Sequence, residues 1–373
     1  MKLALIVPGG VDRSGTHRVV PFLLWLIERL ARANEVHVFA LRQEPAPGTW
    51  DLLGARVHNV GARPRRLGAL AALREEHERS PFDVLHAFWA IPQGVVGAAA
   101  RKLLGRPLLL TLAGGELASL PEIHYGGMRN GQGRLWLRLA LAGADRVVAP
   151  CRSMVEEVER LGRRAEIVPL GVALDAWPPQ PPRPRRPGAP ARLLHVADLS
   201  PVKDQETLLR ALALLAERNV DFGMDLVGGD QSGGRIPGLA RELGLGEQVR
   251  FHGFVPQPAL RELVARGDLL VVSSRHEAGP VVVLEAAASG VPTVGTRVGY
   301  VGEWAPEAAA AVPVGDPQAL ASALQLHLED EERRLALAAA AHARALAQDA
   351  DRMTAAYVGI YEELREEDRR GGS

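Results

Sequence analysis

The feature that most constrains the fold is an alternation of short apolar runs with amphipathic stretches along nearly the whole chain. In the first half, the runs predicted as strands are 3–8, 35–41, 83–89, 107–113, 146–150 and 166–171. The stretches predicted as helices are 18–32, 66–80, 94–104, 133–144 and 153–162. Continuous apolar strands that alternate with helices are typical of a parallel sheet covered on both faces. The first half is therefore expected to be a doubly wound α/β domain.

A proline-rich segment, 178–190, interrupts this alternation with seven prolines. Proline fixes φ and lacks an N–H, so the segment is expected to be extended and exposed. The alternation then restarts, with predicted strands at 192–197, 223–229, 248–254, 268–274 and 291–296. Predicted helices follow at 203–219, 236–244, 258–267, 280–290, 316–328 and 331–366. We therefore expect an N-terminal domain (1–177), a linker (178–190), a C-terminal domain (191–345) and a C-terminal helix (346–373).

Length and composition fit this division and exclude several classes of protein. A chain of 373 residues is long enough for two domains, and a formal net charge of +0 gives no general attraction to nucleic acid. Cys151 is the only cysteine, which excludes an intrachain disulfide. The apolar run at the N-terminus is too short for a signal peptide, and no stretch is long enough to span a membrane. We expect a cytoplasmic protein.

The stretch 277–290, EAGPVVVLEAAASG, predicts a short helix that begins at Pro280 and ends before Gly290. Proline suits the first helical position, where its missing N–H costs no hydrogen bond, and glycine suits the residue after a helix. The helix start would present the backbone N–H groups of Val281 and Val282 together with the positive end of the helix dipole. Such a helix start is a favourable place for an anion.

Two carboxylates flank this helix start. Glu277 precedes it, and Glu285 lies about five residues inside, or roughly 7.5 Å along the helix axis. The spacing suits a ligand with a phosphate in the middle and hydroxyl groups at both ends, because carboxylates accept strong hydrogen bonds from sugar hydroxyls. Spacing alone leaves another interpretation open, in which Glu285 is a half-buried helix residue paired with an arginine and Glu277 is a surface turn residue.

The segment SSRHEAGPVVVLEAAASGVPTVGTRVG resembles the Glu-x7-Glu region of the retaining family 4 glycosyltransferases. Further segments fall in that family's order, namely DVLHAFW, ADRVVAPCRSMVEEVERLG, IVPLGVALDAW, LSPVKDQETLLRALALL, MDLVGGD, LGLGEQVRFHGFV and VPVGDPQALASAL. The resemblance covers nearly the whole chain. It implies the GT-B fold, in which two doubly wound Rossmann-like domains face a cleft and the C-terminal domain binds most of a nucleotide-sugar donor. It also implies that the C-terminal helix (346–373) crosses back onto the N-terminal domain.

The resemblance also implies roles for residues of the C-terminal domain. By position, Glu285 would hold the ribose hydroxyls, Glu277 would contact the donor sugar and stabilise positive charge at its anomeric carbon, and Lys203 would bind the diphosphate. The other donor-binding residues implied are Gly279, Val281 and Val282 for phosphate and sugar, and His252, Gly253 and Phe254 for the base. A carboxylate and a cation placed on opposite sides of a breaking glycosyl-phosphate bond match its developing charges.

In the N-terminal domain, the loop VPGGVDRSGTHR (7–18) is rich in glycine but has neither the NAD-binding nor the P-loop spacing. Without the resemblance it reads as a turn. The resemblance places it on the acceptor side of the cleft. The acceptor-side residues implied are Gly9, Gly10, Gly15, Arg18, His86, Gly114, Gly115 and Glu116.

Two departures from the family pattern bear on the site. Where the family often has an arginine that contacts the diphosphate, this chain has Asp198. We hypothesise that Asp198 turns away and that Arg275, His276 or Arg18 supplies the missing charge. Where the family often has a histidine near the acceptor, this chain has Ala113. The acceptor therefore stays open among carbohydrates, lipid-linked molecules and small molecules.

No metal or cofactor is expected. The DAD sequence at 349–351 resembles a metal motif of another glycosyltransferase fold, but here it precedes a helix and is better explained as a cap. No His or Cys spacing indicates a metal site. The basic stretch RPRR at 63–66 leads into an amphipathic helix and suggests a peripheral contact with anionic lipid, although a solvated loop explains it as well.

The resulting expectation is a metal-independent, retaining transferase of a hexose-type sugar from a nucleoside-diphosphate sugar to an acceptor hydroxyl. Two alternatives remain at this point. A nucleotide-sugar epimerase of the same architecture would consume the donor without an acceptor. A non-catalytic partner subunit would bind the nucleotide sugar and release nothing.

Overall fold

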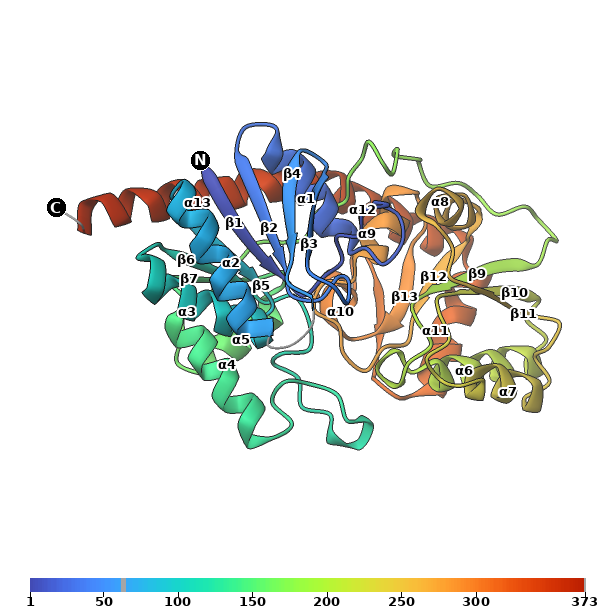
Figure 1. Cartoon of the computed structure of the whole chain (residues 1–373). Coiled ribbons are helices and arrows are strands. Elements are labelled where there is room, and N and C mark those ends of the chain that lie inside the picture. Colours follow the sequence, from blue (N-terminus) through green and yellow to red (C-terminus); the bar gives the residue numbers. More distant parts are fainter. Residues whose placement is uncertain (62–64, 372–373) are drawn as a thin grey trace. The chain divides into compact units, whose positions relative to one another are not determined.

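The computed structural model describes residues 1–61 and 65–371, which divide into two compact units. The first unit consists of Met1–Gly171 together with the C-terminal helix α13 (Ala350–Gly371), and the second consists of Val172–Asp349. In Figure 1 the first unit runs from blue to green and ends in the red helix, and the second runs from green through orange to red.

The first unit is built on an eight-stranded sheet with the order β3-β4-β2-β1-β5-β6-β7-β8. Its strands pair in parallel except β3, which is antiparallel to β4. The strands are β1 (Lys2–Val7), β2 (Glu35–Ala40), β3 (Gly48–Leu52), β4 (Ala55–Asn59), β5 (Val84–Phe88), β6 (Leu108–Thr111), β7 (Arg146–Ala149) and β8 (Glu166–Ile167). Because β1 and β5 are buried at every position, helices must cover both faces of this sheet.

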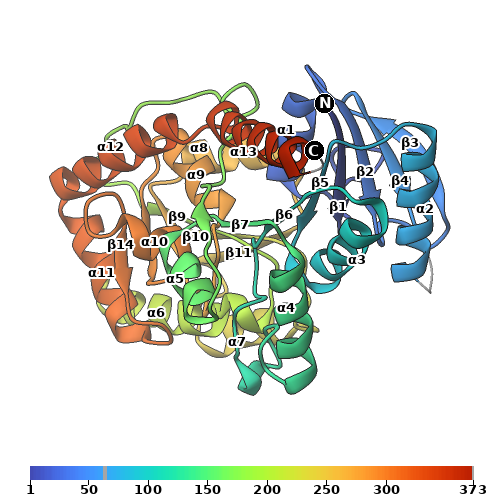
Figure 2. The ribbon, with the colours of Figure 1, turned by 90° about the vertical axis from the view of Figure 1, so that its left-hand side faces the viewer.

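The helices of the first unit supply that cover. They are α1 (Pro21–Ala31), α2 (Arg65–Arg79), α3 (Val95–Leu104), α4 (Gly131–Gly143), α5 (Arg152–Arg160) and α13, with a π-helical turn η1 (Ala90–Gly94) and a 3-10 turn η2 (Pro121–Ile123). Helices α1 and α13 pack together on one face, and α3 lies between α2 and α4 on the other (Figures 1 and 2).

The second unit has a six-stranded parallel sheet with the order β11-β10-β9-β12-β13-β14. The strands are β9 (Ala191–Val196), β10 (Phe222–Val227), β11 (Val249–Gly253), β12 (Leu269–Val272), β13 (Thr293–Thr296) and β14 (Ala310–Val312). The helices are α6 (Gln205–Glu217), α7 (Arg235–Glu242), α8 (Gln257–Arg266), α9 (Val281–Ala288), α10 (Gly299–Trp304), α11 (Pro317–Glu329) and α12 (Glu331–Ala347), with a 3-10 turn η3 (Pro201–Lys203). Helices α6, α7 and α11 cover one face, and α8, α9 and α12 the other (Figures 1 and 2).

Each sheet has one place where the strand order reverses. In the first unit β1 leads to its neighbour β2 on one side, while β5 lies on the other side of β1. In the second unit β9 leads to β10 on one side, while β12 lies on its other side. The connections that leave two such strands diverge to opposite faces, which leaves a crevice at their carboxyl ends where ligands of α/β sheets bind.

The chain leaves the first unit earlier than expected, between Gly171 and Val172, and the proline-rich segment is part of the second unit. That segment is tied to the unit by hydrogen bonds, including Gln180 N–H to the Ala288 carbonyl at 2.9 Å and Arg185 N–H to the Glu331 carboxylate at 2.8 Å. Proline excludes the segment from the sheet, and nearly all of its residues are exposed, as expected. These hydrogen bonds nevertheless dock it on the second unit, so it is an exposed strap of that unit and not a free linker between domains.

Two further elements differ from the sequence expectation. The helix expected at 331–366 is divided into α12 and α13, because the chain returns to the first unit between them and there buries Tyr357 and Tyr361. The β3–β4 hairpin was not predicted at all. Its signal was present in the alternation of Trp50 and Leu52 with exposed residues before a Leu-Gly turn.

Candidate functional site

In the second unit, the loops after β9 and β12 meet at the reversal of strand order. The Arg275 N–H donates to the Val202 carbonyl at 2.8 Å, and the Ser273 hydroxyl donates to the Lys203 carbonyl at 2.7 Å. The Thr296 hydroxyl at the end of β13 holds the Ser274 carbonyl at 2.6 Å. The backbone that carries Lys203 is therefore fixed to the strand end that leads to Glu277.

This arrangement brings Lys203 and Glu277 into direct contact. The Lys203 Nζ lies 2.5 Å from Glu277 Oε1, and the Ser274 hydroxyl donates to the same oxygen at 2.6 Å. Both side chains line a cavity of about 200 Å³, together with Val281 and Val282 at the start of α9. Lysine, carboxylate and helix start, predicted from separate motifs, thus surround one cavity.

Helix α9 spans Val281–Ala288, so Pro280 is its N-cap and not its first residue. Its end agrees with the expectation, because Gly290 follows the C-cap and has a φ of +72° that favours glycine. Gly279 lies in the loop before Pro280. Sequence reasoning missed Gly299, whose φ is +45° and where a Cβ would lie 2.7 Å from the Ala278 carbonyl oxygen. This glycine lets α10 begin directly against the Glu277 loop.

Glu285 is 4% exposed, one turn inside α9. Burial raises the pKa of its carboxyl to about 8. Among residues 1–61 and 65–371, no arginine or other donor contacts that carboxyl, so the interpretation of Glu285 as an arginine-paired helix residue is wrong. A buried carboxyl without a cation is costly to ionise, which is typical of a binding position and not of a structural one.

His195 also lines the small cavity and was not singled out from the sequence. Its Nδ1–H donates to the Val271 carbonyl at 2.9 Å, and its Nε2 accepts from the Gln205 side chain at 3.1 Å. Burial lowers the pKa of His195 to about 4, so the ring is neutral at physiological pH. It closes the floor of the cavity beside Lys203 without adding charge.

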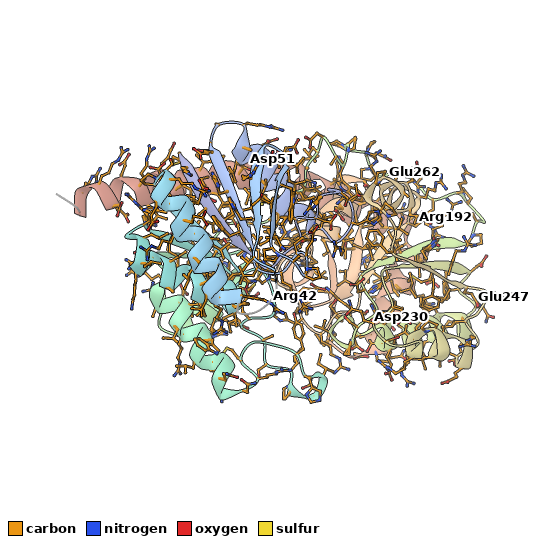
Figure 3. All side chains as sticks on the ribbon, viewed as in Figure 1. Arg42, Asp51, Arg192, Asp230, Glu247 and Glu262 are labelled. Atoms are coloured by element: carbon orange, nitrogen blue, oxygen red, sulfur yellow. The ribbon has the colours of Figure 1, made fainter. Side chains whose placement is uncertain are left out.

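Asp198 is held within its own unit by N–H donors. Its carboxylate accepts hydrogen bonds from the Gly229 N–H at 2.8 Å and the Gln231 side chain at 2.9 Å. It therefore anchors the loop after β10, which also carries Asp230 (Figure 3). Arg275, one of the proposed substitutes for the family arginine, lies 3.2 Å from the buried Asp204.

The residues expected near the base lie at the end of β11. The His252 ring contacts the Asp225 carboxylate at 2.6 Å, and the Gly253 carbonyl accepts from the Gly228 N–H at 2.9 Å. The Phe254 ring is 56% exposed. None of the three lines the small cavity, so the structure does not bring them to Lys203 and Glu277.

In the first unit, the glycines of the loop after β1 serve the loop itself. Gly10 has a φ of +80°, and a Cβ there would lie 2.5 Å from the Val20 side chain. A Cβ on Gly9 would lie 3.0 Å from the Arg42 carbonyl oxygen. The chain's own atoms therefore fill the space beside these two glycines, and their place on the acceptor side stays a prediction. Gly15 alone faces a nearly open position.

The same loop contains an ion pair between Arg18 and Asp12. Burial opposes ionisation of Asp12, but hydrogen bonds from Ser14, Arg18 and Gln43 outweigh it and lower its pKa to about 2. The Gln43 side chain in turn accepts from the Gly10 N–H at 2.7 Å. Arg18 is thus already engaged in organising its own loop.

The expectation that His86 contributes to a ligand site is wrong. The ring is 1% exposed, its Nδ1 is hydrogen-bonded to the Tyr361 hydroxyl at 2.6 Å, and its Nε2 is hydrogen-bonded to the Thr111 hydroxyl at 2.7 Å. Burial holds the pKa of His86 well below its usual range. Helix α13, which belongs to the first unit, covers this histidine through Tyr361.

A larger pocket of the first unit, about 710 Å³, lies at its own reversal of strand order, beyond the ends of β5 and β6. Trp89, Gln93 and Glu116 line it, and Trp89 has a φ of +68°, which is rare for an aromatic residue. Gln93 is 2% exposed and Glu116 is 6% exposed, yet Gln93 Oε1 and Glu116 Oε2 accept no hydrogen bond. Strained backbone and unsatisfied buried acceptors are typical of ligand sites.

Of the acceptor-side residues predicted after β6, Gly115 and Glu116 line this pocket. Burial raises the pKa of Glu116, although backbone N–H groups including that of Ala113 partly offset it. A Cβ on Gly115 would overlap the Tyr125 ring, and a Cβ on Gly114 would lie 2.7 Å from the Trp89 indole nitrogen. Both glycines thus allow aromatic rings to form the pocket wall.

One group of potential metal ligands escaped the sequence because it comes from three elements. His37, His58 and Glu76 place ligand atoms within 4.8 Å of one another. The Lys2 ammonium lies 2.7 Å from the Glu76 carboxylate, and His37 Nδ1 lies 2.9 Å from His58 Nε2. Burial, with the charge of His37, lowers the pKa of His58 to about 4. These contacts explain the group as an internal polar network.

The possible lipid contact at 63–66 falls partly outside the described residues, because these exclude 63 and 64. Arg66 is described, and its guanidinium lies 4.3 Å from the centre of the Trp136 ring. Among the described residues, no helix combines the length and the apolar character needed to cross a bilayer.

Both units match families of known proteins. Residues 19–173 match the family described as glycosyl transferase 4-like domain, and residues 179–344 match glycosyl transferases group 1. The chain is 32% identical to D-inositol 3-phosphate glycosyltransferase of Thermomonospora curvata, over 78% of this chain and 77% of that protein. It is 26% identical to N-acetyl-alpha-D-glucosaminyl L-malate synthase of Bacillus anthracis, over 83% and 82%.

Solved structures share the architecture. The sucrose-phosphate synthase of Thermosynechococcus elongatus superposes with a TM-score of 0.84 at 21% identity, covering 98% of this chain and 99% of that one. Anabaena HepE, solved in complex with UDP and glucose, superposes with a TM-score of 0.73 at 21% identity, covering 97% and 99%.

Proposed function

This chain belongs to the family 4 glycosyltransferases and has the GT-B fold, and from that premise we propose that it transfers a hexose-type sugar from a nucleoside-diphosphate sugar to an acceptor hydroxyl with retention of configuration. The observation that carries the proposal is the meeting of Lys203, Glu277 and the start of α9 around one cavity. We also propose a cytoplasmic location.

The chemistry of transfer requires both charges of this site. Departure of the nucleoside diphosphate leaves positive charge on the sugar ring and adds negative charge to the phosphate oxygens. Lys203 and the N–H groups of Val281 and Val282 would stabilise the diphosphate, and Glu277 would stabilise the sugar. We propose that this fixed positive charge serves the leaving group without a metal ion.

Donor binding would have to open the ion pair. The Lys203 side chain is 28% exposed and the Glu277 side chain 13% exposed, so a diphosphate can reach the lysine from solvent. As Lys203 turns to phosphate, Glu277 keeps the Ser274 hydroxyl as its donor and faces the sugar. Glu285, deeper in α9, would accept hydrogen bonds from the ribose hydroxyls, and its desolvated carboxyl makes those bonds strong.

We propose the 710 Å³ pocket of the first unit as the acceptor side. Gln93 and Glu116 offer it two buried acceptors for hydroxyl groups, and Arg66 and Arg129 line the same pocket and could hold an anionic group. Two relatives, an inositol 3-phosphate glycosyltransferase and an N-acetyl-alpha-D-glucosaminyl L-malate synthase, are each named after a small hydroxylated anion.

A thermal-shift panel with UDP, GDP, ADP and dTDP tests the donor site. One nucleotide should stabilise the wild-type protein by about 2.7 kcal/mol at a hundredfold excess over its dissociation constant, and Lys203→Ala should abolish most of that shift. Lys102→Ala, an exposed lysine of the first unit, is the control. No shift with any nucleotide would contradict the assignment.

The comparisons do not favour the two alternatives. The relatives and solved structures named above are transferases or synthases, and none is named as an epimerase or a binding subunit. Sugar release that depends on an acceptor and on Glu277 would exclude both.

A further inference from the structure

Helix α4 carries an apolar face on its outer side. Leu137, Ala140 and Leu141 are buried against the first unit, whereas Leu135 is 56% and Leu139 is 46% exposed. These two leucines are four residues apart, so they are neighbours on one face of the helix. Adjacent leucines that face solvent do not contribute to the core, and an exposed apolar patch marks a surface that binds a partner.

Arginines surround these leucines. Arg134 and Arg138 are exposed and have the same four-residue spacing. Within the part of the chain that the structure describes, the Arg134 guanidinium bonds only a backbone carbonyl, that of Met128, at 3.0 Å. Among the described residues, Arg138 makes no ion pair. The sequence from 123 to 144 contains no aspartate or glutamate, so nothing on α4 neutralises the two arginines.

The start of α2 extends the same surface. Arg66 stacks on Trp136 of α4 with 4.3 Å between the guanidinium carbon and the ring centre, and Leu67 beside it is 66% exposed. Residues 65–74 contain no acidic side chain either. We refer to Arg66, Leu67, Arg134, Leu135, Arg138 and Leu139 together as the leucine–arginine face.

We propose that the leucine–arginine face docks on anionic lipid, with its leucines in the interfacial layer and its arginines on the headgroup phosphates. The charge of the face distinguishes an anionic lipid surface from a second copy of this chain as its partner. Arginines without neighbouring acids repel a second copy of the same face and attract an anionic surface. Leucines next to arginines, without acids, also match the composition of helices that lie in a membrane interface.

The position of this face adds a consequence that rests on the proposed function. Arg66 belongs both to the face and to the wall of the 710 Å³ pocket. Trp136, on which Arg66 stacks, lines the pocket too, as do Gln132 and Gly133 at the start of α4. A headgroup on the docked lipid surface would therefore lie next to the pocket. We infer that the acceptor is lipid-linked and that its hydroxylated, anionic headgroup enters the pocket from that surface.

Vesicle co-flotation tests the docking. The full chain should float with vesicles of phosphatidylcholine mixed with phosphatidylglycerol and not with pure phosphatidylcholine. Leu135→Ser/Leu139→Ser should reduce the bound fraction about tenfold, since it removes two leucines that would leave water. Arg134→Gln/Arg138→Gln should reduce it by a similar factor and remove most of its salt dependence. Leu326→Ser, a 44% exposed leucine of α11, is the matched control and should bind as wild type does.

The outcomes separate the proposals. Failure to float with anionic vesicles, or flotation that both double variants retain, overturns the docking. Sedimentation velocity tests whether the face binds a second copy of this chain. If the wild-type chain does not float but self-associates, and Leu135→Ser/Leu139→Ser abolishes that self-association, the face is a contact between copies and the lipid proposal is overturned. Thermal shift by nucleotide in the same variants shows that they fold. It also reports the donor site independently, so failure of one proposal leaves the other measurable.

Discussion

Replacement of Glu285 by glutamine should change how the stability of the protein depends on pH. In the folded chain, burial raises the pKa of this carboxyl to about 8 from an ordinary value of 4.5, so the folded state holds a proton that the unfolded state releases between these values. Folding is therefore favoured at low pH, and this contribution is lost as the pH rises toward 8. The loss is about 1.4 kcal/mol per pH unit within the interval.

The buried histidines act in the opposite direction. His195 and His58, with pKa values lowered to about 4, destabilise the folded state as the pH falls below about 6.5. The interval from pH 6.5 to pH 8 therefore isolates Glu285. Across it, the free energy of unfolding of the wild-type chain should fall by about 1.5 kcal/mol relative to that of Glu285→Gln.

Urea unfolding followed by tryptophan fluorescence measures this difference, because Trp177 and Trp304 are buried in the same unit as Glu285. Glu262→Gln, which changes an exposed carboxylate of α8, is the control and should run parallel to the wild type (Figure 3). A constant difference between Glu285→Gln and wild type across this interval would refute the argument that Glu285 is held protonated by burial.

Four further substitutions test the site and its supports. Lys203→Ala should weaken nucleoside-diphosphate binding about 10- to 100-fold by calorimetry, because a charge-assisted contact is lost; unchanged binding would remove Lys203 from the donor site. Asp198→Ala should cost about 1 kcal/mol of stability, because the Gly229 N–H loses its acceptor, and should leave donor affinity within about threefold; a large gain in affinity would show that Asp198 repels the diphosphate. Gly10→Ala should destabilise the chain in thermal unfolding by about 2 kcal/mol or more, and Gly15→Ala by about 1 kcal/mol, since both have positive φ but only Gly10 lacks space for a Cβ; equal losses would contradict the packing argument.

The sequence predicts well that Lys203, Glu277 and the start of α9 come together, because the information for this arrangement is local. The alternation of apolar and amphipathic stretches places Lys203 and Glu277 just after two strands, and parallel strands carry such residues to one edge of the sheet. The reversal of strand order then makes β9 and β12 neighbours. Pro280 and Gly290 likewise mark the ends of α9 to within one residue.

What the sequence did not predict depends on contacts between distant segments. His86 follows the same strand-end logic as Glu277, but α13 returns from the far end of the chain and buries it under Tyr361. The docking of the proline-rich strap and the group of His37, His58 and Glu76 also arise from several separate elements. Local periodicity carries no information about these contacts.

The lining of the 710 Å³ pocket in the first unit also depends on contacts between separate segments. Glu116 was selected from a motif, but its unsatisfied oxygen, its neighbour Gln93 and the aromatic wall of Trp89 and Tyr125 become visible only once the loops after β5 and β6 are folded. The sequence predicts an acceptor side, and the structure shows which buried groups line the pocket that we propose for it.

The central claim is that Glu277 and Lys203 form the reacting end of a nucleotide-sugar site. Its most direct test is nucleoside-diphosphate release from UDP-, GDP-, ADP- and dTDP-glucose, with wild type, Glu277→Gln and the exposed control Glu262→Gln. We expect one donor to be hydrolysed slowly by wild type and control, and Glu277→Gln to lower the rate at least about 100-fold while its nucleotide affinity is preserved. Equal release by wild type and Glu277→Gln, or no release with any donor and any acceptor, would contradict the claim.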